Sequence, residues 1–393
     1  TVKDVHYYAH DESLLDDVRY VWIIRTESLD PLRFLARFKK RNRKYPATQT
    51  NNRSSRSLLN FLNYLIGNWL FIPDSKILWI PFAIIKSVRL IRQNKVKAIY
   101  TTSPPHSAHI AGLILKIVTR VKWVADFRDD WTGGESQPCP THFHHLINRF
   151  IEKLVLKYTD QVVGMCDHLT NALYQKSSFP AKDKFITIMN GYDPDDFEPV
   201  LNTQQNKLFT ITHCGSISKV SHPESFLKAY KKVLDENPGA RGDINVEFIG
   251  TDIFGKLNVL LEKYSLGDYI NPIKYVPHQE ALKRIMASHV LLITVLKKTD
   301  EEIITGKIFE YLASGKKILM ISDDGYVPRL IRQLDRGDVI KETDIQGISN
   351  VIYSYFSDFK KNKFFHAKPL NVVQFDRRKL TGELASVLDR IIK

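Results

Sequence analysis

Short apolar runs alternate with amphipathic segments along most of this chain. In the first half, each run of consecutive apolar residues predicts a strand, and the segment after it has apolar positions at the three-and-four spacing of a helix. The predicted strands are 96–100, 123–125, 161–164 and 185–189, and the predicted helices are 106–119, 144–158 and 167–176. Strands that alternate with helices in this way are typical of a parallel sheet with helices on both faces.

The same alternation begins again after a break at 194–199, where proline and acidic residues replace the apolar rhythm. The strands predicted beyond the break are 208–213, 246–249, 273–276, 290–294 and 317–321. The helices predicted there are 223–235, 254–264, 279–287 and 306–314, with a final helix at about 376–392. The pattern predicts an α/β protein with two doubly wound, Rossmann-like domains, spanning 1–195 and 196–374, and a last helix within 375–393.

The composition is that of an ordinary soluble globular protein, with 43% hydrophobic and 25% charged residues. A length of 393 residues suffices for two domains with cores of their own. Cys139, Cys166 and Cys214 are far apart and form no Cys-x-x-Cys pair, which favours a reducing, cytoplasmic setting over a disulfide framework or a thiolate zinc site. No signal peptide is visible at the start, and the longest apolar run, 77–85, is too short to span a membrane.

Positive charge is concentrated in one part of the chain. The net charge is +14, and residues 31–125 contain eighteen Lys or Arg but a single acid, Asp74. The basic cluster at 31–44 precedes an uncharged segment, 57–71, that is rich in Leu, Phe, Tyr and Trp. This combination is typical of a peripheral membrane element, so we predict that residues 31–72 contact an anionic membrane surface at the inner face of the cell membrane. A solvated basic face beside a core helix is the alternative; nucleic acid is not a predicted partner, because no RNA- or DNA-binding motif accompanies the charge.

Glu302 and Glu310 lie on either side of the start of a predicted helix. A carboxylate in such a position can accept hydrogen bonds from the vicinal hydroxyls of a ribose or a hexose. The backbone N–H groups of Thr305, Gly306 and Lys307 would lie at the helix N-terminus, which favours anions. This segment therefore predicts a sugar site beside a phosphate site; two surface carboxylates near a helix start are the alternative.

A second group of candidate residues belongs to the first half of the chain. Asp126, Arg128 and Asp129 directly follow a predicted strand, at the edge where open α/β sheets bind ligands. Because charges in such a place need partners, they either contact an acceptor substrate or pair with each other to hold the loop. His106 and His109 are one helical turn apart, which fits acceptor or phosphate contact as well as capping or packing. Without a third ligand they predict no metal site.

Several of these segments resemble motifs of the retaining glycosyltransferases of family 4, in the subgroup that builds bacterial surface polysaccharides. The matching segments, in chain order, are 101–109, 123–132, 189–197, 248–250, 275–280 and 302–315, within roughly residues 70 to 390. The resemblance implies the GT-B fold, in which two Rossmann-like domains face a central cleft and a C-terminal helix crosses back to the first domain. Family members begin with a first strand and a Gly-rich turn that are not recognisable here, so we expect the start of this sequence to be truncated.

The resemblance also implies a role for individual residues of the second domain. Glu310 would bind the ribose, Glu302 the transferred sugar, and the backbone of Thr305 and Gly306 the diphosphate. The other donor contacts that it implies are those of Gly215, Ser216, Val276 and Pro277.

The leaving diphosphate needs positive charge, and stabilising it is usually the largest catalytic contribution in such sites. Many family members have an arginine where this chain has Ser216, so Lys219 and Lys307 are the candidate cations. On the acceptor side, the functional interpretation places Asp126 or Asp129 near the reacting hydroxyl and Arg128 near a phosphate, with His106 and His109 in contact with the acceptor or a phosphate.

The predicted function is therefore that of a retaining glycosyltransferase that needs neither a metal nor another cofactor. It would move a sugar from a nucleotide-diphosphate sugar to a membrane-associated, lipid-linked or oligosaccharide acceptor. The sequence Asp193-Pro194-Asp195 matches the Asp-x-Asp of metal-dependent GT-A enzymes, but it lies at the predicted domain boundary and is interpreted as a turn. Two alternatives remain: a nucleotide-sugar 2-epimerase of the same fold, which would not need the 31–72 segment, and a non-catalytic scaffold, with which Ser216 is compatible.

Overall fold

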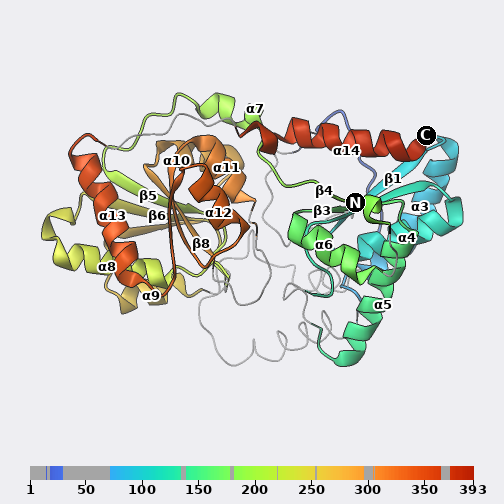
Figure 1. Ribbon diagram of the computed structural model, residues 1–393, viewed down its shortest axis with the longest axis horizontal. Helices are drawn as coiled ribbons and strands as arrows, with labels where there is room; N and C mark the ends of the chain where they lie inside the picture. Colours follow the sequence, from blue (N-terminus) through green and yellow to red (C-terminus); the bar gives the residue numbers. More distant parts are fainter. Residues whose placement is uncertain are drawn as a thin grey trace, which may run out of the picture. The chain divides into compact units, whose positions relative to one another are not determined.

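The chain forms two compact units, each built around one parallel sheet (Figure 1). The computed structural model describes residues 15, 18–29, 71–133, 139–177, 181–218, 220–252, 255–295, 304, 306–363 and 372–393. The first unit comprises Thr1–Met189 with Leu380–Lys393, and the second comprises Asn190–Lys379.

The first unit has a four-stranded sheet in the order β1-β2-β3-β4, with every pair of neighbours parallel. Its strands are β1 (Ala98–Ser103), β2 (Lys122–Phe127), β3 (Gln161–Gly164) and β4 (Phe185–Thr187). Its helices are η2 (Ile77–Trp79), α3 (Ile80–Gln93), α4 (Ser107–Thr119), α5 (His142–Tyr158), α6 (Asp167–Lys176), η3 (Lys182–Lys184) and most of α14 (Arg377–Ile392).

The two faces of this sheet are covered by different helices (Figure 1). Successive parallel strands that are also neighbours have right-handed crossovers, which place α4, α5 and α6 on one face. On the other face, Leu380 and Val387 of α14 pack against Val124, Val163 and Ile188. Since side chains alternate along a strand, β2 presents Val124 to α14 and its odd-numbered residues to the opposite face.

The second unit has a six-stranded parallel sheet in the order β10-β9-β8-β5-β6-β7. Its strands are β5 (Phe209–Cys214), β6 (Ile244–Ile249), β7 (Ile270–Ile273), β8 (Val290–Val295), β9 (Lys317–Ser322) and β10 (Gly337–Ile340). Its helices are α7 (Pro194–Phe197), η4 (Glu198–Val200), α8 (Glu224–Glu236), η5 (Pro238–Ala240), α9 (Leu257–Lys263), α10 (His278–Ala287), α11 (Lys307–Ser314), α12 (Tyr326–Gln333), α13 (Ile345–Lys360) and η6 (Val373–Phe375). The strand order reverses between β5 and β8, and open α/β sheets bind ligands at the carboxyl ends of the strands at such a point.

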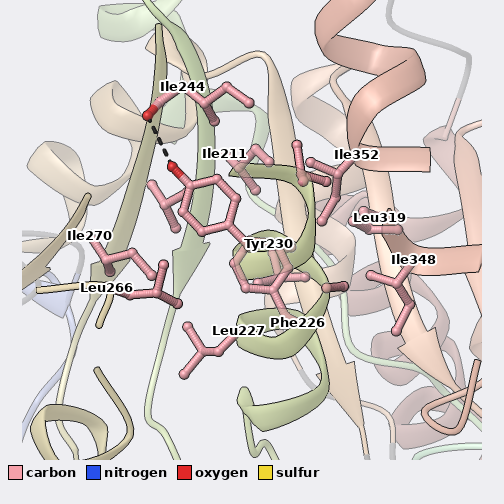
Figure 2. Close-up of a cluster of buried hydrophobic side chains, with 14 of the residues drawn as sticks. Ile211, Phe226, Leu227, Tyr230, Ile244, Leu266, Ile270, Leu319, Ile348 and Ile352 are labelled. Atoms are coloured by element: carbon pink, nitrogen blue, oxygen red, sulfur yellow. Dashed lines mark hydrogen bonds between the residues drawn. The ribbon is translucent and has the colours of Figure 1, made fainter. Parts of the chain in front are cut away.

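The core of the second unit joins α8 and α13 to the sheet (Figure 2). Phe226 and Tyr230 of α8 and Ile348 of α13 are fully buried, and the hydroxyl of Tyr230 donates to the carbonyl of Ile244, 3.2 Å away. Burying each such side chain contributes about 1.5–3 kcal/mol relative to leaving it exposed. The strand ends that carry the candidate site therefore belong to a well-packed sheet.

Most predicted elements are confirmed within a few residues, and the α/β class with two parallel sheets is confirmed. The strand predicted at 273–276 is wrong, because β7 covers Ile270–Ile273 and ends where the prediction begins. Pro272 lies inside β7, which is possible because β7 is an edge strand and one of its sides needs no ladder partner. The pattern does not predict α3, α12, α13 or β10.

The interpretation of 193–195 as a turn is also corrected. Asp193 is the N-cap of α7, its Oδ1 accepts a hydrogen bond from the Asp195 N–H at 3.1 Å, and Pro194 occupies the first helical position. Aspartate and proline are both favoured at these places in a helix start.

Candidate functional site

Two glycine turns lie at the carboxyl ends of β5 and β6. Gly215 and Gly250 have φ angles of +131° and +134°, which side chains rarely permit. A Cβ atom on Gly250 would lie 2.6 Å from the carbonyl oxygen of Gly215, so the turns touch backbone to backbone. A side chain from another element also approaches the Gly215 turn.

That side chain is Lys307, the first residue of α11. A Cβ atom on Gly215 would lie 2.8 Å from Nζ of Lys307, so the amino group rests against the Gly215 turn. Burial lowers the pKa of Lys307 to about 8. Within the described residues, no carboxylate forms an ion pair with it. A cation at a helix N-terminus opposes the helix dipole, and an anionic ligand would offset both unfavourable contributions.

The amino group of Lys307 has an acceptor in His213, the buried histidine near the end of β5. Nζ of Lys307 lies 3.4 Å from Nε2 of His213, and Nδ1 of His213 lies 3.1 Å from the carbonyl oxygen of Leu292. Since a carbonyl oxygen only accepts, Nδ1 carries the proton and Nε2 keeps its lone pair. Burial holds the pKa of His213 well below its ordinary value, so the ring is neutral.

A second contact ties α11 to the same strand. The Cys214 N–H donates to the hydroxyl of Tyr311 at 2.8 Å, and the Tyr311 side chain is fully buried. Burial raises the pKa of the Cys214 thiol to about 11, so this cysteine is not a nucleophile near neutral pH. Its backbone N–H is used within the protein.

Glu310 lies one turn further along α11, on its half-buried side. Its Oε1 is 2.9 Å from Nε2 of His278, the first residue of α10, and Nδ1 of that ring lies 3.9 Å from Oδ2 of Asp196. The hydrogen bond to Glu310 raises the pKa of His278. Glu310 and Lys307 are three residues apart, so they project from neighbouring turns of one helix face.

The remaining predicted donor residues have different surroundings. Gly306 is the exposed N-cap of α11, and Ser216 is exposed after β5. Val276 is half-buried, whereas the carbonyl of Pro277 already accepts the Ala281 N–H of α10 at 3.0 Å and Pro277 has no N–H. Of these two residues, Val276 is the one with a backbone N–H. Lys219, Glu302 and Thr305 lie outside the described residues.

In the first unit, Asp126 is the centre of a buried network and only 1% exposed. Its Oδ2 accepts hydrogen bonds from the hydroxyls of Tyr100 and Thr102 and from Nε of Arg128 at 2.8 Å. Arg128 also donates to the carbonyl of Ile188 at 2.9 Å. These contacts favour the alternative in which the Asp126–Arg128 pair holds the loop.

Asp129 differs from its neighbours because it is exposed at the carboxyl end of β2, although partial burial of its carboxyl group raises its pKa. Its loop is fixed from both sides: Lys176 of α6 pairs with Asp130 and, at 3.4 Å, with buried Glu152 of α5, and Thr132 donates to Glu152. Asp129 is therefore an accessible carboxylate on a loop that is held in place.

His106 and His109 are buried among aromatic rings. The ring of His106 stacks on Trp131 at 4.8 Å with an interplanar angle of 8°, and His109 lies 4.4 Å from the Phe127 ring. Burial lowers the pKa of His106 to about 4 and that of His109 to about 3, so both rings are neutral. This environment favours packing over contact with a charged substrate.

The predicted acceptor residues do not form one cluster. Asp126 lies on the same face of β2 as Val124, which packs on α14, whereas Phe127 and the histidines belong to the opposite face. The predicted strand ended at Ala125, before Asp126 and Phe127, so the sequence did not show this separation. His278 lies in the 275–280 segment that resembles a family motif, but no role was predicted for it, and no sequence signal identifies His213, because its contact joins segments that are far apart in the chain.

The structure bears only in part on the predictions about the membrane segment and about metal. Residues 31–70, most of the predicted membrane segment, lie outside the described residues. Across the described part of the chain, no helix is both long enough and apolar enough to span a bilayer, and no group of three His, Cys, Asp or Glu side chains is arranged to hold a metal ion.

The fold is that of the GT-B glycosyltransferases, as solved structures with the same architecture establish. HepE of Anabaena, solved in complex with UDP, aligns with a TM-score of 0.59 at 16% identity over 78% of this chain and 82% of its own. Sucrose-phosphate synthase of Thermosynechococcus elongatus aligns with a TM-score of 0.62 at 14% identity, covering 81% and 80%. TarM of S. aureus, also solved with UDP, aligns with a TM-score of 0.56 at 10% identity, covering 80% and 59%.

The sequence matches no family model and no curated protein.

Proposed function

We propose that this protein is a glycosyltransferase that takes a sugar from a nucleotide-diphosphate sugar. The observation that carries the proposal is the placement of Lys307 and Glu310 on one helix at the carboxyl end of β5, within a GT-B fold. A cation at a helix N-terminus suits a diphosphate, and a carboxylate one turn away suits the ribose hydroxyls. Both groups lie at the end of the sheet where this fold class binds nucleotides.

The donor is proposed to be a uridine diphosphate sugar. HepE and TarM, which share the fold, were both solved with UDP. In this chain, Glu302 would bind the transferred sugar, Lys219 would join Lys307 at the leaving diphosphate, and Thr305 would contact it through its backbone. Charge neutralisation by lysines and N–H groups would make a metal ion unnecessary. Retention of the anomeric configuration is proposed from the family resemblance.

On the acceptor side, Asp129 is a better candidate than Asp126 to meet the incoming hydroxyl. Asp126 is buried and its Oδ2 already accepts three hydrogen bonds, whereas Asp129 is exposed on a fixed loop. A general base needs its carboxylate within hydrogen-bond reach of the proton that it removes. Asp129 could meet an incoming hydroxyl without rearrangement of the Asp126–Arg128 pair.

The acceptor is proposed to be lipid-linked and to be met at an anionic membrane surface. Besides the 31–72 segment, helix α5 supports this: Phe143, Leu146 and Phe150 lie on one exposed face, with 66%, 51% and 64% of their surfaces exposed. Exposed Lys153 and Lys157 extend the same face, and the one acid of this helix, Glu152, is buried. Apolar side chains beside lysines suit an anionic bilayer.

A donor screen tests the proposal. The free energy of unfolding would be measured by thermal denaturation with UDP, GDP, ADP and their sugars. A true ligand at a hundredfold excess over its Kd stabilises by about 2.7 kcal/mol. We expect UDP and UDP-sugars to stabilise, uridine to do so far less, and sugar release from the stabilising donor to be measurable. Absence of stabilisation by every nucleotide would refute a nucleotide-sugar enzyme.

A further inference from the structure

The contact between His213 and Lys307 joins the proposed donor site to a buried histidine that would not itself touch the donor. His213 is 1% exposed and lies between β8 and the lysine, with a hydrogen bond to each. The β5–β8 ladder pairs Ile211 with Val290 and Thr212 with Leu291, and Leu292 lies one residue beyond it. The carbonyl of Leu292 is used by the histidine ring, which fixes both the tautomer and the direction of Nε2.

A hydrogen-bond acceptor without charge is well suited to the position beside Lys307. A carboxylate there would pair with Lys307 and reduce the charge that it presents to a ligand. An apolar side chain would leave the amino group of Lys307 desolvated and without a hydrogen-bond acceptor. The neutral amine would then be favoured over the ammonium. Nε2 of His213 accepts a hydrogen bond from the ammonium and leaves its charge intact.

We propose that His213 is a positioning residue, whose Nε2 holds the charged amino group of Lys307 against the Gly215 turn, where it meets the diphosphate of the donor. The inference rests on the proposed function. It also implies regulation: nucleotide affinity falls as pH rises and Lys307 loses its proton, and His213 moves that loss to a higher pH.

Other titratable groups around Lys307 have to be separated from it. Burial keeps Cys214 and Tyr311 protonated at neutral pH, since it raises both of their pKa values. Glu310 is on the same helix, and His278, bonded to it, has a raised pKa and adds its own pH dependence. Comparison of variants at equal pH cancels this contribution, because His278 is present in all of them.

The test compares UDP binding by calorimetry for the wild-type protein, His213→Phe and His213→Gln between pH 6.5 and pH 9. Loss of one hydrogen bond that an ammonium donates raises its acid dissociation constant about tenfold. We expect His213→Phe to bind UDP about tenfold more weakly than wild type at pH 9 and within about twofold at pH 6.5. The glutamine variant, which can accept from Lys307 and donate to Leu292, should recover most of the affinity.

A deficit of equal size at every pH, or wild-type affinity in His213→Phe at pH 9, overturns the proposal. The double variant His213→Phe with Lys307→Met provides the control, because His213 should have no further effect once the amino group is absent.

A second measurement does not depend on nucleotide binding. The rate at which an amine-reactive reagent modifies Lys307, followed by mass spectrometry from pH 6 to pH 10, reports the pKa of Lys307 in the ligand-free protein. His213→Phe should move this profile to lower pH, and His213→Gln should move it less; unchanged profiles in both variants overturn the proposal. If wild type fails to bind UDP while the profiles shift as expected, the donor assignment fails and the role of His213 stands. If His213→Phe does not fold, the pH profiles of Lys307 modification are compared for His213→Gln, His213→Asn and wild type. Equal profiles for all three proteins overturn the proposal.

Discussion

Nε2 of His278 lies 2.9 Å from Oε1 of Glu310, so the proposed ribose-binding carboxylate is held from one side by a neighbouring helix. The second carboxylate oxygen is not engaged in this bond and remains the oxygen to which a ribose hydroxyl can donate. The core side of α11 is formed by other residues, Phe309, Tyr311 and Leu312, which are fully buried. Glu310 can therefore be altered with little disturbance of the fold.

Replacing Glu310 by glutamine should weaken UDP binding by at least about tenfold, because hydrogen bonds to a charged group contribute about 1.5–3 kcal/mol. Sugar transfer by Glu310→Ala should be undetectable. Calorimetry and a transfer assay measure the two effects. Glu280→Gln is the matched control, since Glu280 is a surface carboxylate of α10 paired with Arg284. Wild-type UDP affinity in a folded E310Q protein would remove Glu310 from the ribose site.

The His278–Glu310 bond should make stability depend on pH. The bond raises the pKa of His278 in the folded protein. Its stabilisation is therefore complete below the pKa that His278 has in the unfolded chain, and it is lost as pH rises through the pKa that His278 has in the folded protein. His278→Ala should lower the free energy of unfolding by on the order of 1 kcal/mol more at pH 6 than at pH 9. Urea denaturation at the two pH values measures the difference. An equal loss at both would mean that the charged form of His278 does not contribute.

Transfer should continue without divalent metal. Lys307 and the N-terminus of α11 supply positive potential at the proposed diphosphate site. Activity in EDTA should stay within about twofold of the untreated enzyme, whereas a metal-dependent diphosphate site would lose several kcal/mol of charge stabilisation. Loss of activity that Mg²⁺ or Mn²⁺ restores would contradict the proposed mechanism.

Sedimentation with anionic vesicles should depend on both α5 and the 31–44 basic cluster. Changing Phe143, Leu146 and Phe150 together to serine should reduce vesicle binding by at least about tenfold, since each removes exposed apolar surface that would enter the interface. Reversing four of Arg37, Lys39, Lys40, Arg41 and Lys44 to Glu should have a similar effect, greatest at low salt.

The matched control for this experiment is Val259→Ser with Tyr353→Ser, which changes exposed apolar residues of α9 and α13 in the other unit. UDP affinity should be unchanged in all of these variants. If the wild type does not bind anionic vesicles at low salt, the membrane proposal is wrong and the donor proposal is unaffected.

Gly250→Ala should destabilise the protein strongly. The new Cβ would lie 2.6 Å from the carbonyl oxygen of Gly215, and the backbone has a φ angle of +134°. Strain and overpacking together predict a loss of about 2–4 kcal/mol in the free energy of unfolding. Gly239→Ala, where a Cβ meets nothing within 4 Å, should change it by less than about 0.5 kcal/mol. Equal stability of the two variants, measured by urea denaturation, would show that the Gly215–Gly250 contact can relax.

The periodicity of apolar residues determined the class of fold and most element positions. Gln161–Gly164 and Asp167–Lys176 were predicted with their observed bounds, because the strand is centred on the buried pair Val162 and Val163 and the helix after it has apolar residues at helical spacing. Local rules also located α11, which is followed by Gly315 with a φ angle of +72°, a conformation common for a glycine after a helix. Such signals depend only on neighbours in the chain.

Local rules failed where an element's place in the sheet decided the outcome. Ile270–Ile273 became a strand despite Pro272, because an edge position tolerates a residue without an N–H. Local rules also left two interpretations of Asp126 open, because the hydroxyls of Tyr100 and Thr102 that bond to it belong to another strand.

The sequence by itself offered residue types that could bind a sugar and a diphosphate: Glu310 at a predicted helix start, and Lys307 from the family resemblance. Only the tertiary structure supplied their partners. His213 is 94 residues from Lys307, and His278 is 32 residues from Glu310. These pairs meet because parallel strands and their helices bring the ends of β5, α10 and α11 to one edge of the sheet. No local pattern encodes that approach, because it depends on the order of strands and on the packing of the whole second unit.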